Sequence, residues 1–441
     1  MFSAINRRVK RMAIRQQKKK SVVRISDTTL RDGCQTPGVR LDPAAKVRIA
    51  VALAEAGFHS IDVGFPAAGP SEVEAIQRIA KVVKGPVLSA HSRTLPKDID
   101  LAAQALCGVS PLKRAVTLFI GTSPLHREHK HQMSKTQVID AVVQAIDYAH
   151  GEFEIIAFGP EDASRTEPEF LHEVYEKAIQ AGAVSIGFAD TVGILTPTKA
   201  AESIRRIQDS VPSIGDALLG VHFHNDLGLA TANSLACVKE GVNVVQGTIN
   251  GIGERAGNTP NEEVVLALTL HRDEFGVSVA VDPSKLYALS QLVAELTQFR
   301  PAPNKAVIGK NLFRTESGVH QSAMLKHSAT YMPFPPELVG AGPVELVLGP
   351  NSGRSAVRYH MEAAGMEASE DYVELVMNHL KNDRHAPEDS AEIKAFLERM
   401  RPYLTDDELG ADADDGGSAD DRAAISEQAT LDEQAALNQE N

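Results

Sequence analysis

Two histidines, His222 and His224, stand two positions apart at the end of an apolar run that is closed by Gly228. Side chains two positions apart on a β-strand point to the same face, so this pair aims two imidazoles at one point. First-row divalent metals accept imidazole nitrogens as ligands. Taken alone, the pair fits equally well two histidines that line a buried polar strand, so other residues must decide between the two interpretations.

Two more polar segments follow short apolar runs. Residues 27–33 (DTTLRDG) contain Arg31 and Asp32, and residues 250–258 (NGIGERAGN) end in Asn258. One carboxylate with two imidazoles is a mixed oxygen and nitrogen ligand set that suits Mn²⁺, Zn²⁺, Co²⁺ or Fe²⁺ and permits Mg²⁺. Considered separately, these segments also fit a capped turn and a glycine-rich surface loop. A metal site therefore requires an architecture that brings the three segments together.

The elements that would position these residues repeat along the chain as a short β-rich run, a polar turn and an amphipathic helix. The runs span residues 22–26, 60–65, 86–90, 115–120, 153–158, 184–188, 218–223 and 243–249. Pro43, Pro197 and Pro260 stand where the first turns of helices are expected. Eight βα units in about 250 residues predict a (β/α)₈ TIM barrel.

The rival α/β architecture is a doubly wound sheet. Its first turn is often a glycine-rich phosphate loop, whereas the first turn here, DTTLRDGCQTPG, is polar. In a barrel, catalytic groups gather at the carboxyl ends of the strands. The first, seventh and eighth strands become neighbours when the barrel closes, so the three polar segments would share one rim.

Charge and composition divide the chain into four parts. We expect a basic, disordered arm over residues 1–21, the barrel over 22–282, a mainly helical lid or dimerisation region over 283–404, and an acidic, disordered tail over 405–441. The net charge of −13 argues against nucleic acid as the main partner. No apolar run approaches the roughly 18 residues of a membrane-spanning helix.

The cysteine content bears on location. Three scattered cysteines suit a reducing compartment, and we expect a cytoplasmic protein. The arginine-rich, acid-free N-terminus leaves organelle targeting open.

Seven segments, in this order, resemble the acetyl-CoA-condensing family of 2-isopropylmalate, homocitrate and citramalate synthases: DTTLRDGCQTPG, VGFPAAGPSEVEA, GTSPLH, EDASRTE, ADTVGILTP, HFHNDLGLATANSLA and NGIGERAGN. The resemblance covers residues 22–365. It implies a metal-dependent TIM-barrel acyltransferase that joins acetyl-CoA to a 2-oxo acid in a Claisen-type condensation and then hydrolyses the thioester. It also implies a divalent metal (Mn²⁺, Mg²⁺ or Zn²⁺) and a homodimer.

The resemblance also assigns roles to residues of this chain. Asp32, His222 and His224 would be metal ligands, and Asn258 would be a further ligand or a neighbour of one. Arg31 would stabilise the negative charge that develops on the keto oxygen. Thr191 would bind the carboxylate of the substrate.

Deprotonation of the acetyl methyl group needs a positioned base. Glu161 and His320 resemble the residues that serve this step in the family, and Tyr331 resembles a third partner. His320 and Tyr331 lie beyond the barrel segment. In the family this region reaches over the barrel mouth of a partner subunit, which is why the resemblance implies a homodimer.

The choice of 2-oxo acid is left open by the sequence. The segments GTSPLH and TPGV resemble the 2-isopropylmalate and citramalate branches of the family, whose pockets accept apolar groups. The first of these reactions is a step of leucine biosynthesis. Arg127 is reminiscent of homocitrate synthases, where it would pair with a second carboxylate, and it equally fits a solvated loop. His91 and Arg93 could also line the substrate pocket.

We therefore rank 2-oxoisovalerate first, followed by 2-oxoglutarate, pyruvate and phosphonopyruvate. A lyase similar to the hydroxymethylglutaryl-CoA lyases is disfavoured, because those enzymes generally lack the SGVHQ and LGPNSGR segments. A binding protein without catalysis is disfavoured by the intact polar motifs.

Overall fold

The computed structural model describes residues 22–382, 387 and 390–402. These residues form two compact units. The first contains the described residues up to 313 together with 334–343, and the second contains 314–333 and the described residues from 344 onward. The predicted basic arm (1–21) and acidic tail (405–441) lie outside the described residues.

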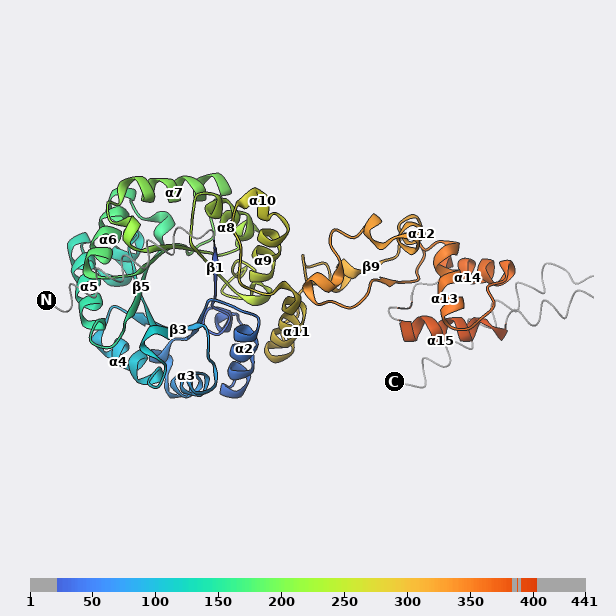
Figure 1. Cartoon of the computed structure of the whole chain (residues 1–441), viewed down its shortest axis with the longest axis horizontal. Coiled ribbons are helices and arrows are strands. Elements are labelled where there is room, and N and C mark those ends of the chain that lie inside the picture. Colours follow the sequence, from blue (N-terminus) through green and yellow to red (C-terminus); the bar gives the residue numbers. More distant parts are fainter. Residues whose placement is uncertain (1–21, 383–386, 388–389, 403–441) are drawn as a thin grey trace, which may run out of the picture. The chain divides into compact units, whose positions relative to one another are not determined.

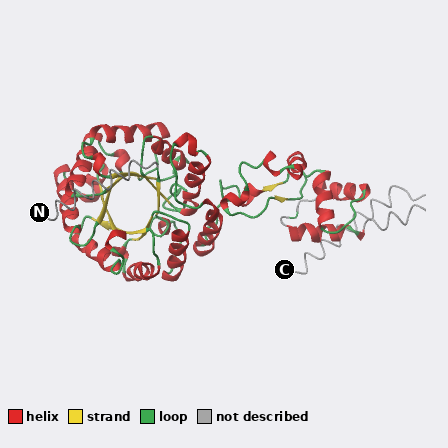
Figure 2. Cartoon of the chain, viewed as in Figure 1, coloured by secondary structure: helices red, strands yellow, loops and turns green. Residues whose placement is uncertain are grey.

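The first unit is a closed barrel of eight parallel strands, which confirms the predicted TIM barrel. Each strand pairs with the next in the chain, and β1 also pairs with β8, which closes the ring seen in Figure 2. The strands are β1 (Arg24–Asp27), β2 (Ser60–Gly64), β3 (Val87–Arg93), β4 (Arg114–Gly121), β5 (Ile155–Glu161), β6 (Ser185–Asp190), β7 (Leu218–Phe223) and β8 (Val244–Gly247).

Helices surround the strand ring (Figure 1). They are α2 (Pro43–Glu55), α3 (Pro70–Val82), α4 (Pro96–Ala105), α5 (Lys135–Ala149), α6 (Pro168–Ala181), α7 (Pro197–Ser210), α8 (Ala230–Lys239), α9 (Asn261–Leu270), α10 (Arg272–Phe275) and α11 (Leu286–Thr297). Pro43 and Pro197 occupy first helical positions as predicted, where a missing N–H costs nothing. Pro260 instead precedes α9 as its N-cap residue.

The core of the barrel unit lies between strands and helices. Along β5 and β6 burial alternates: Ile156, Phe158, Ile186 and Phe188 are fully buried against the helices, while the residues between them are only partly buried. This period of two is that of strand residues pointing to opposite faces.

The barrel unit extends beyond the predicted boundary at residue 282. The reason is that α11 packs against α2 and buries Leu286, Leu289 and Val293 in the same core as the strands. Residues 334–343 belong to this unit as well, because the 3₁₀ turn Pro336–Val339 contacts the turn Pro283–Lys285 that precedes α11.

The second unit contains a short parallel pair, β9 (Arg314–Thr315) and β10 (Glu345–Leu346). Its helices are α12 (Gly318–Lys326), α13 (Arg354–Ala363), α14 (Glu370–Asn382) and α15 (Ser390–Met400). A separate core includes Val357 of α13, Val376 of α14 and Leu397 of α15.

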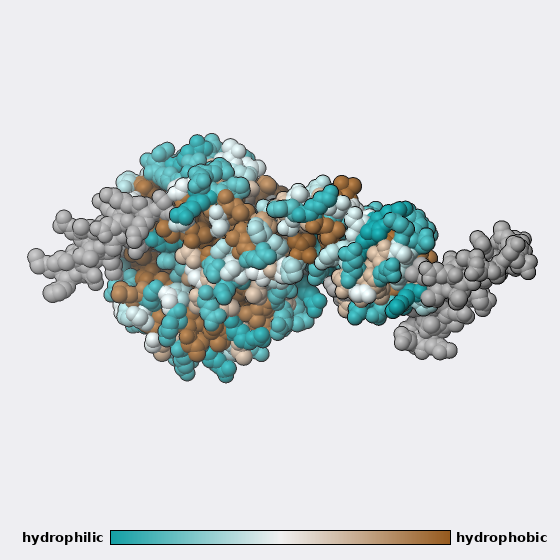
Figure 3. All heavy atoms as spheres, turned by 45° about the vertical axis from the view of Figure 1, so that its right-hand side comes forward, coloured by the Kyte–Doolittle hydropathy of each residue, from teal (hydrophilic) through white to brown (hydrophobic). Residues whose placement is uncertain are grey.

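Figure 3 shows hydrophilic side chains over much of the visible surface and hydrophobic ones between them, mainly over the barrel unit. Within the described part of the chain, no helix has both the length and the apolar character needed to cross a membrane.

Candidate active site at the carboxyl end of the barrel

Three segments bring the predicted metal ligands together. Asp32 follows β1, His222 lies in β7, and His224 follows that strand on the same side. The side-chain donor atoms of these three residues lie within 4.8 Å of one another. The two imidazole Nε2 atoms are 3.2 Å apart, and His222 Nε2 is 3.7 Å from Asp32 Oδ2. The structure therefore brings Asp32, His222 and His224 together at one point.

Asn258 belongs to the same cluster. A backbone bridge joins it to His224, and its Nδ2 donates to Asp32 Oδ1 at 2.8 Å. Gly253 makes this approach possible: a Cβ at that position would lie 2.0 Å from Asn258 Nδ2 and 2.9 Å from Asp32 Oδ1. The loop after β8 must therefore carry glycine where it passes the carboxylate.

The electrostatics of the cluster suit a divalent cation. Burial, with a smaller effect of His224, lowers the pKa of His222 to about 3, so this imidazole is neutral at physiological pH. Burial alone would raise the pKa of Asp32, but the charge of Arg31 and the hydrogen bond from Asn258 hold it well below its ordinary value. Neutral imidazoles beside an ionised carboxylate are the donor set that Mn²⁺, Zn²⁺ and related cations take. The residues present thus fit a bound metal.

Arg31 lies between two buried carboxylates. Its Nε donates to Asp62 Oδ2 at 2.8 Å and its Nη1 to Asp32 Oδ2 at 2.9 Å. Burial alone would lower the pKa of Arg31, but the Asp62 and Asp32 carboxylates raise it above its ordinary value. Thr28 Oγ1 also donates to Asp62. Sequence reasoning missed Asp62, although a carboxylate inside the apolar second strand run was a visible signal.

Glu161 ends β5 and faces the barrel cavity. Both its carboxylate oxygens accept from Lys130 Nζ, at 2.8 and 2.6 Å. Lys130 lies in a π-helical turn, His126–His131, and was not predicted as a site residue. Thr191 also lines the cavity, and its Oγ1 accepts from the Asp162 amide at 2.9 Å.

The predicted substrate-binding residues separate into two groups. His91 lines the cavity and stacks on Phe119 with 4.5 Å between ring centroids. Burial, followed by the charge of Arg31, lowers its pKa well below the ordinary value. Arg93 instead pairs with Asp98 at the start of α4, and half of its side chain is exposed.

Arg127, like Arg93, pairs with an acidic residue outside the cavity wall. Its guanidinium makes two hydrogen bonds to Glu167, at 2.8 and 2.7 Å, and lies over the Phe170 ring. Neither Arg93 nor Arg127 lines the cavity. Both arginines have a local acidic partner that the spacing of the sequence did not reveal.

His320 and Tyr331 belong to the second unit. Both are exposed, and their rings stack with 3.8 Å between centroids and 24° between planes. The structure therefore pairs these two predicted residues with each other.

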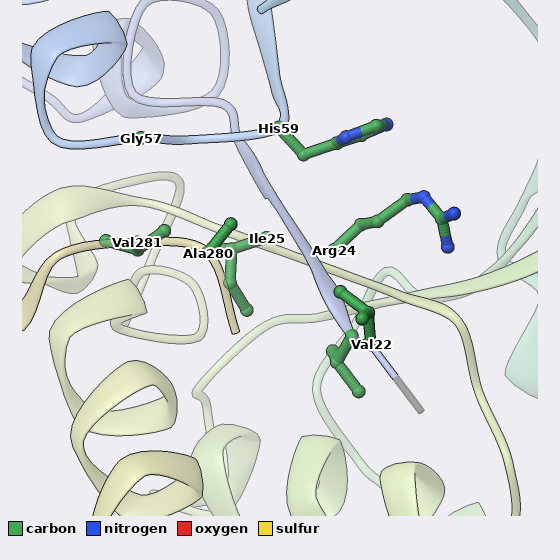
Figure 4. A pocket seen from close by; sticks show the side chains of 8 residues that line it. Val22, Arg24, Ile25, Gly57, His59, Ala280 and Val281 are labelled. Atoms are coloured by element: carbon green, nitrogen blue, oxygen red, sulfur yellow. The ribbon is translucent and has the colours of Figure 1, made fainter. Parts of the chain in front are cut away.

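The cavity at this site has a volume of about 780 Å³. Its wall includes the predicted metal ligands Asp32, His222 and His224 and reaches deep between the strands. A smaller cavity, of about 260 Å³, lies beside the amino end of β1. Figure 4 shows Arg24 and His59 projecting to the same side there. None of the predicted site residues lines the smaller cavity.

Comparison with known protein families gives two matches along the chain. A family model described as HMGL-like matches residues 22–293, and one described as homocitrate synthase post-HMGL domain-like matches residues 307–386. The first covers the barrel, including Asp32, His222 and His224. The second covers the segment that contains His320 and Tyr331.

Curated relatives are similar over most of their length. A 2-isopropylmalate synthase of Heliobacterium modesticaldum is 40% identical over 87% of this chain and 72% of its own length. A 2-isopropylmalate synthase of Pyrococcus furiosus is 41% identical over 85% of this chain and 75% of its own length.

Among solved structures, hydroxymethylglutaryl-CoA lyase of Pseudomonas aeruginosa has a TM-score of 0.54 at 22% identity, over 63% of this chain and 93% of its own. The hydroxymethylglutaryl-CoA lyase of Brucella melitensis has a TM-score of 0.54 at 20% identity, over 63% of this chain and 99% of its own. At these identities the likeness concerns the fold alone.

Proposed function

The chain belongs to the HMGL-like family, in the group of acyltransferases that condense acetyl-CoA with 2-oxo acids, and from this premise we propose that it forms 2-isopropylmalate from 2-oxoisovalerate. The observation that carries the proposal is the convergence of Arg31 with the donor atoms of Asp32, His222 and His224 on one cavity. That set matches the needs of a reaction in which negative charge develops on a ketone oxygen.

A divalent cation held by Asp32, His222 and His224, with Asn258 as a further ligand or as the group that orients Asp32, would supply Lewis-acid polarisation of the 2-oxo acid. The proposed ion is Mn²⁺, Mg²⁺ or Zn²⁺. Arg31 has its guanidinium fixed by Asp62 and Asp32, so it stabilises the developing alkoxide without reorganising during the reaction.

Thr191 is proposed to bind the substrate carboxylate. Because its Oγ1 accepts from the Asp162 amide, the hydroxyl proton is left to donate into the cavity. The neutral His91 ring with Phe119 and Phe65 gives an aromatic wall, which suits a branched apolar side chain.

Glu161 is the proposed base that removes a proton from the acetyl methyl group of acetyl-CoA. In support, its carboxylate lies at the carboxyl end of β5 and faces the same cavity as the metal-ligand residues. We propose that His320 and Tyr331 of a second copy of the chain join it, so that the enzyme works as a homodimer. Exposed Leu125, Ile194 and Leu227 on loops after β4, β6 and β7 are consistent with a covered rim.

The alternative substrate, 2-oxoglutarate, depended on Arg127 as partner of a second carboxylate. That guanidinium is occupied by Glu167 and lies outside the cavity wall. This placement favours the apolar substrate. All three cysteines are free thiols, which suits a reducing compartment, and the cytoplasm is our proposed location.

The test is a thiol-release assay with acetyl-CoA and each of 2-oxoisovalerate, 2-oxoglutarate, pyruvate and phosphonopyruvate. We expect the highest kcat/KM with 2-oxoisovalerate, and no change of preference in Arg127→Ala. Release of CoA with none of the four acids would overturn the proposal. Highest activity with 2-oxoglutarate that is selectively lost in Arg127→Ala would replace it with homocitrate synthesis.

A further inference from the structure

Many of the strand residues that line the inside of this barrel are small. Five successive strands, β3 to β7, contribute Ser89, Thr117, Ala157, Gly187 and Gly220 to the cavity wall. In most TIM barrels these layers are filled by bulky branched side chains, so that the interior is a packed core. Here the same positions leave a hollow, which we call the lower chamber and define by these five residues.

The lower chamber is continuous with the metal centre. One cavity of about 780 Å³ touches Asp32 and His222 at one end and Val87 and Leu218, the first residues of β3 and β7, at the other. His91 lies four positions after Val87 along β3, which corresponds to about 13 Å of strand. That depth exceeds what an isopropyl group needs.

Burial along the strands supports an open interior. In β5 and β6 the residues that face the helices are buried, whereas Ala157, Gly159 and Gly187, which line the cavity, are only partly buried. Protein interiors are normally close-packed, and unfilled volume costs stability. A hollow of this size is therefore a feature that a ligand would occupy.

Two glycines show that the missing side chains leave free space. A Cβ built on Gly159 meets no heavy atom within 4 Å, and one on Gly187 meets only Gly159 Cα, at 3.9 Å. Neither glycine has a left-handed φ, so the backbone would accept another residue. Larger side chains would fit, yet the chain carries none.

We propose that the lower chamber receives the side chain of the 2-oxo acid, and that the enzyme accepts straight-chain 2-oxo acids longer than 2-oxoisovalerate. This inference rests on the proposed condensation with acetyl-CoA. The walls of the chamber have little charge: Ser89 Oγ and Thr117 Oγ1 hydrogen-bond each other at 2.7 Å, and alanine and glycine supply the rest. Each methylene buried there adds favourable hydrophobic transfer.

The far end of the cavity limits the length. His59, Lys113 and Glu154 line it there, below the small-residue layer. A methyl terminus gains nothing from charged neighbours. We therefore expect activity to persist as the chain grows and then to fall once the tail reaches this polar end.

The experiment measures kcat/KM by thiol release, with product mass as confirmation, for the full chain loaded with Mn²⁺ and given 2-oxoisovalerate, 2-oxohexanoate or 2-oxooctanoate. For the wild type we expect 2-oxooctanoate to retain at least about a tenth of the value for 2-oxoisovalerate. In Gly187→Val and Gly159→Val, kcat/KM for 2-oxooctanoate divided by kcat/KM for 2-oxoisovalerate should fall about tenfold or more. The reason is that the new side chains fill the chamber.

Gly215→Val is the matched control. A Cβ there also meets nothing within 4 Å, and the residue lies outside the cavity wall, so the ratio should stay as in the wild type. Gly187→Ala, with the smaller side chain, replaces Gly187→Val if that variant does not fold.

Two results would overturn the inference: loss of nearly all activity already with 2-oxohexanoate in the wild type, or an unchanged ratio in the folded chamber variants. Absence of CoA release with 2-oxoisovalerate itself would instead contradict the proposed function. The two failures are thus distinguishable.

Discussion

Asp32 is the residue on which the candidate metal centre depends most directly. It accepts hydrogen bonds from Asn258 and Arg31 and lies 3.7 Å from His222 Nε2. A single carboxylate thereby joins the loops after β1 and β8 to strand β7. Removing it would take away the charged ligand and leave two neutral imidazoles, a set with little affinity for a hard cation.

We therefore expect Asp32→Ala and His224→Ala to bind Mn²⁺ at least about 100-fold more weakly than the wild type. Isothermal titration calorimetry of the metal-free proteins measures this directly. His271→Ala serves as the control, because His271 is exposed at the end of α9. Wild-type affinity in both ligand variants would contradict the assignment of the centre.

The planar guanidinium of Arg31 can be tested by a substitution that keeps its charge. Its guanidinium bridges Asp62 and Asp32, and a lysine ammonium would keep the charge without the planar, bridging geometry. In Arg31→Lys we expect kcat to fall about 10²- to 10³-fold with a smaller change in KM, because the lost interaction forms mainly in the transition state. Steady-state kinetics test this, and a change confined to KM would show that Arg31 only binds substrate.

At the scale of elements, the start of α9 holds the loop after β8 through a buried acid. Glu262 is fully buried, accepts from the Asn250 amide at 3.1 Å, and has Lys305 Nζ at 3.7 Å. Asn250 has a left-handed backbone and exchanges hydrogen bonds with Ser290 of α11. The loop that carries Gly253 and Asn258 is thus fixed to two helices.

Burial raises the pKa of Glu262 from 4.5 to about 7. The folded state then holds this proton more tightly than the unfolded state, so the contribution to stability is full below pH 4.5 and is lost as the pH rises to about 7. Between pH 4.5 and about 7 the free energy of unfolding of the wild type should therefore fall. Glu262→Gln lacks this titrating group, so its free energy of unfolding should fall by about 1–3 kcal/mol less over the same interval.

Urea denaturation at several pH values measures the difference. Glu169→Gln, at an exposed position in the first turn of α6, is the control and should follow the wild type. Identical pH profiles for Glu262→Gln and the wild type would show that Glu262 does not titrate in this range.

The sequence was sufficient to predict the eight strands and the meeting of Asp32, His222, His224 and Asn258. Strand runs and turn residues are local signals, and barrel closure then brings the first, seventh and eighth strands together. The sequence was not sufficient to predict the partners of buried charges. The pairing of Asp62 with Arg31 links strand β2 to the turn after β1, and that of Arg127 with Glu167 depends on where a loop meets the start of α6.

The open interior of the barrel was also beyond the sequence pattern. Ala157, Gly187 and Gly220 have no local feature that distinguishes them from ordinary strand residues. In the register, Gly187 lies beside Gly220 and Ala157 beside Ser185, and all four residues line the cavity. The sequence also carries no local sign that residues 286–297 belong to the barrel unit, which follows from the packing of α11 on α2 and from the hydrogen bonds between Ser290 and Asn250.

At the scale of the whole molecule, the proposed machinery is divided between the two units. The metal centre, Arg31 and Glu161 lie in the barrel unit, whereas His320 and Tyr331 lie in the second unit. If a second copy of the chain supplies His320 and Tyr331, a dimer of one barrel-unit variant and one second-unit variant should contain one intact site. Two variants that are each inactive alone should then regain activity when combined.

We expect mixed dimers of Asp32→Ala and His320→Ala, formed by unfolding and refolding the two together, to recover about a quarter of wild-type activity, since half of the dimers then hold one intact site. Each variant refolded alone is the control and should stay inactive. No recovery, despite a dimeric mass in light scattering, would contradict completion of the site by a partner copy.

The central claim is a carbon–carbon bond formed between the methyl carbon of acetyl-CoA and the ketone carbon of a 2-oxo acid. Mass spectrometry of the product from methyl-trideuterated acetyl-CoA and 2-oxoisovalerate tests it most directly. We expect 2-isopropylmalate that retains two of the three deuterium atoms, because one is removed as the proton lost to the base. Release of CoA with trideuterated acetate and no condensed product would show that the enzyme only hydrolyses the thioester.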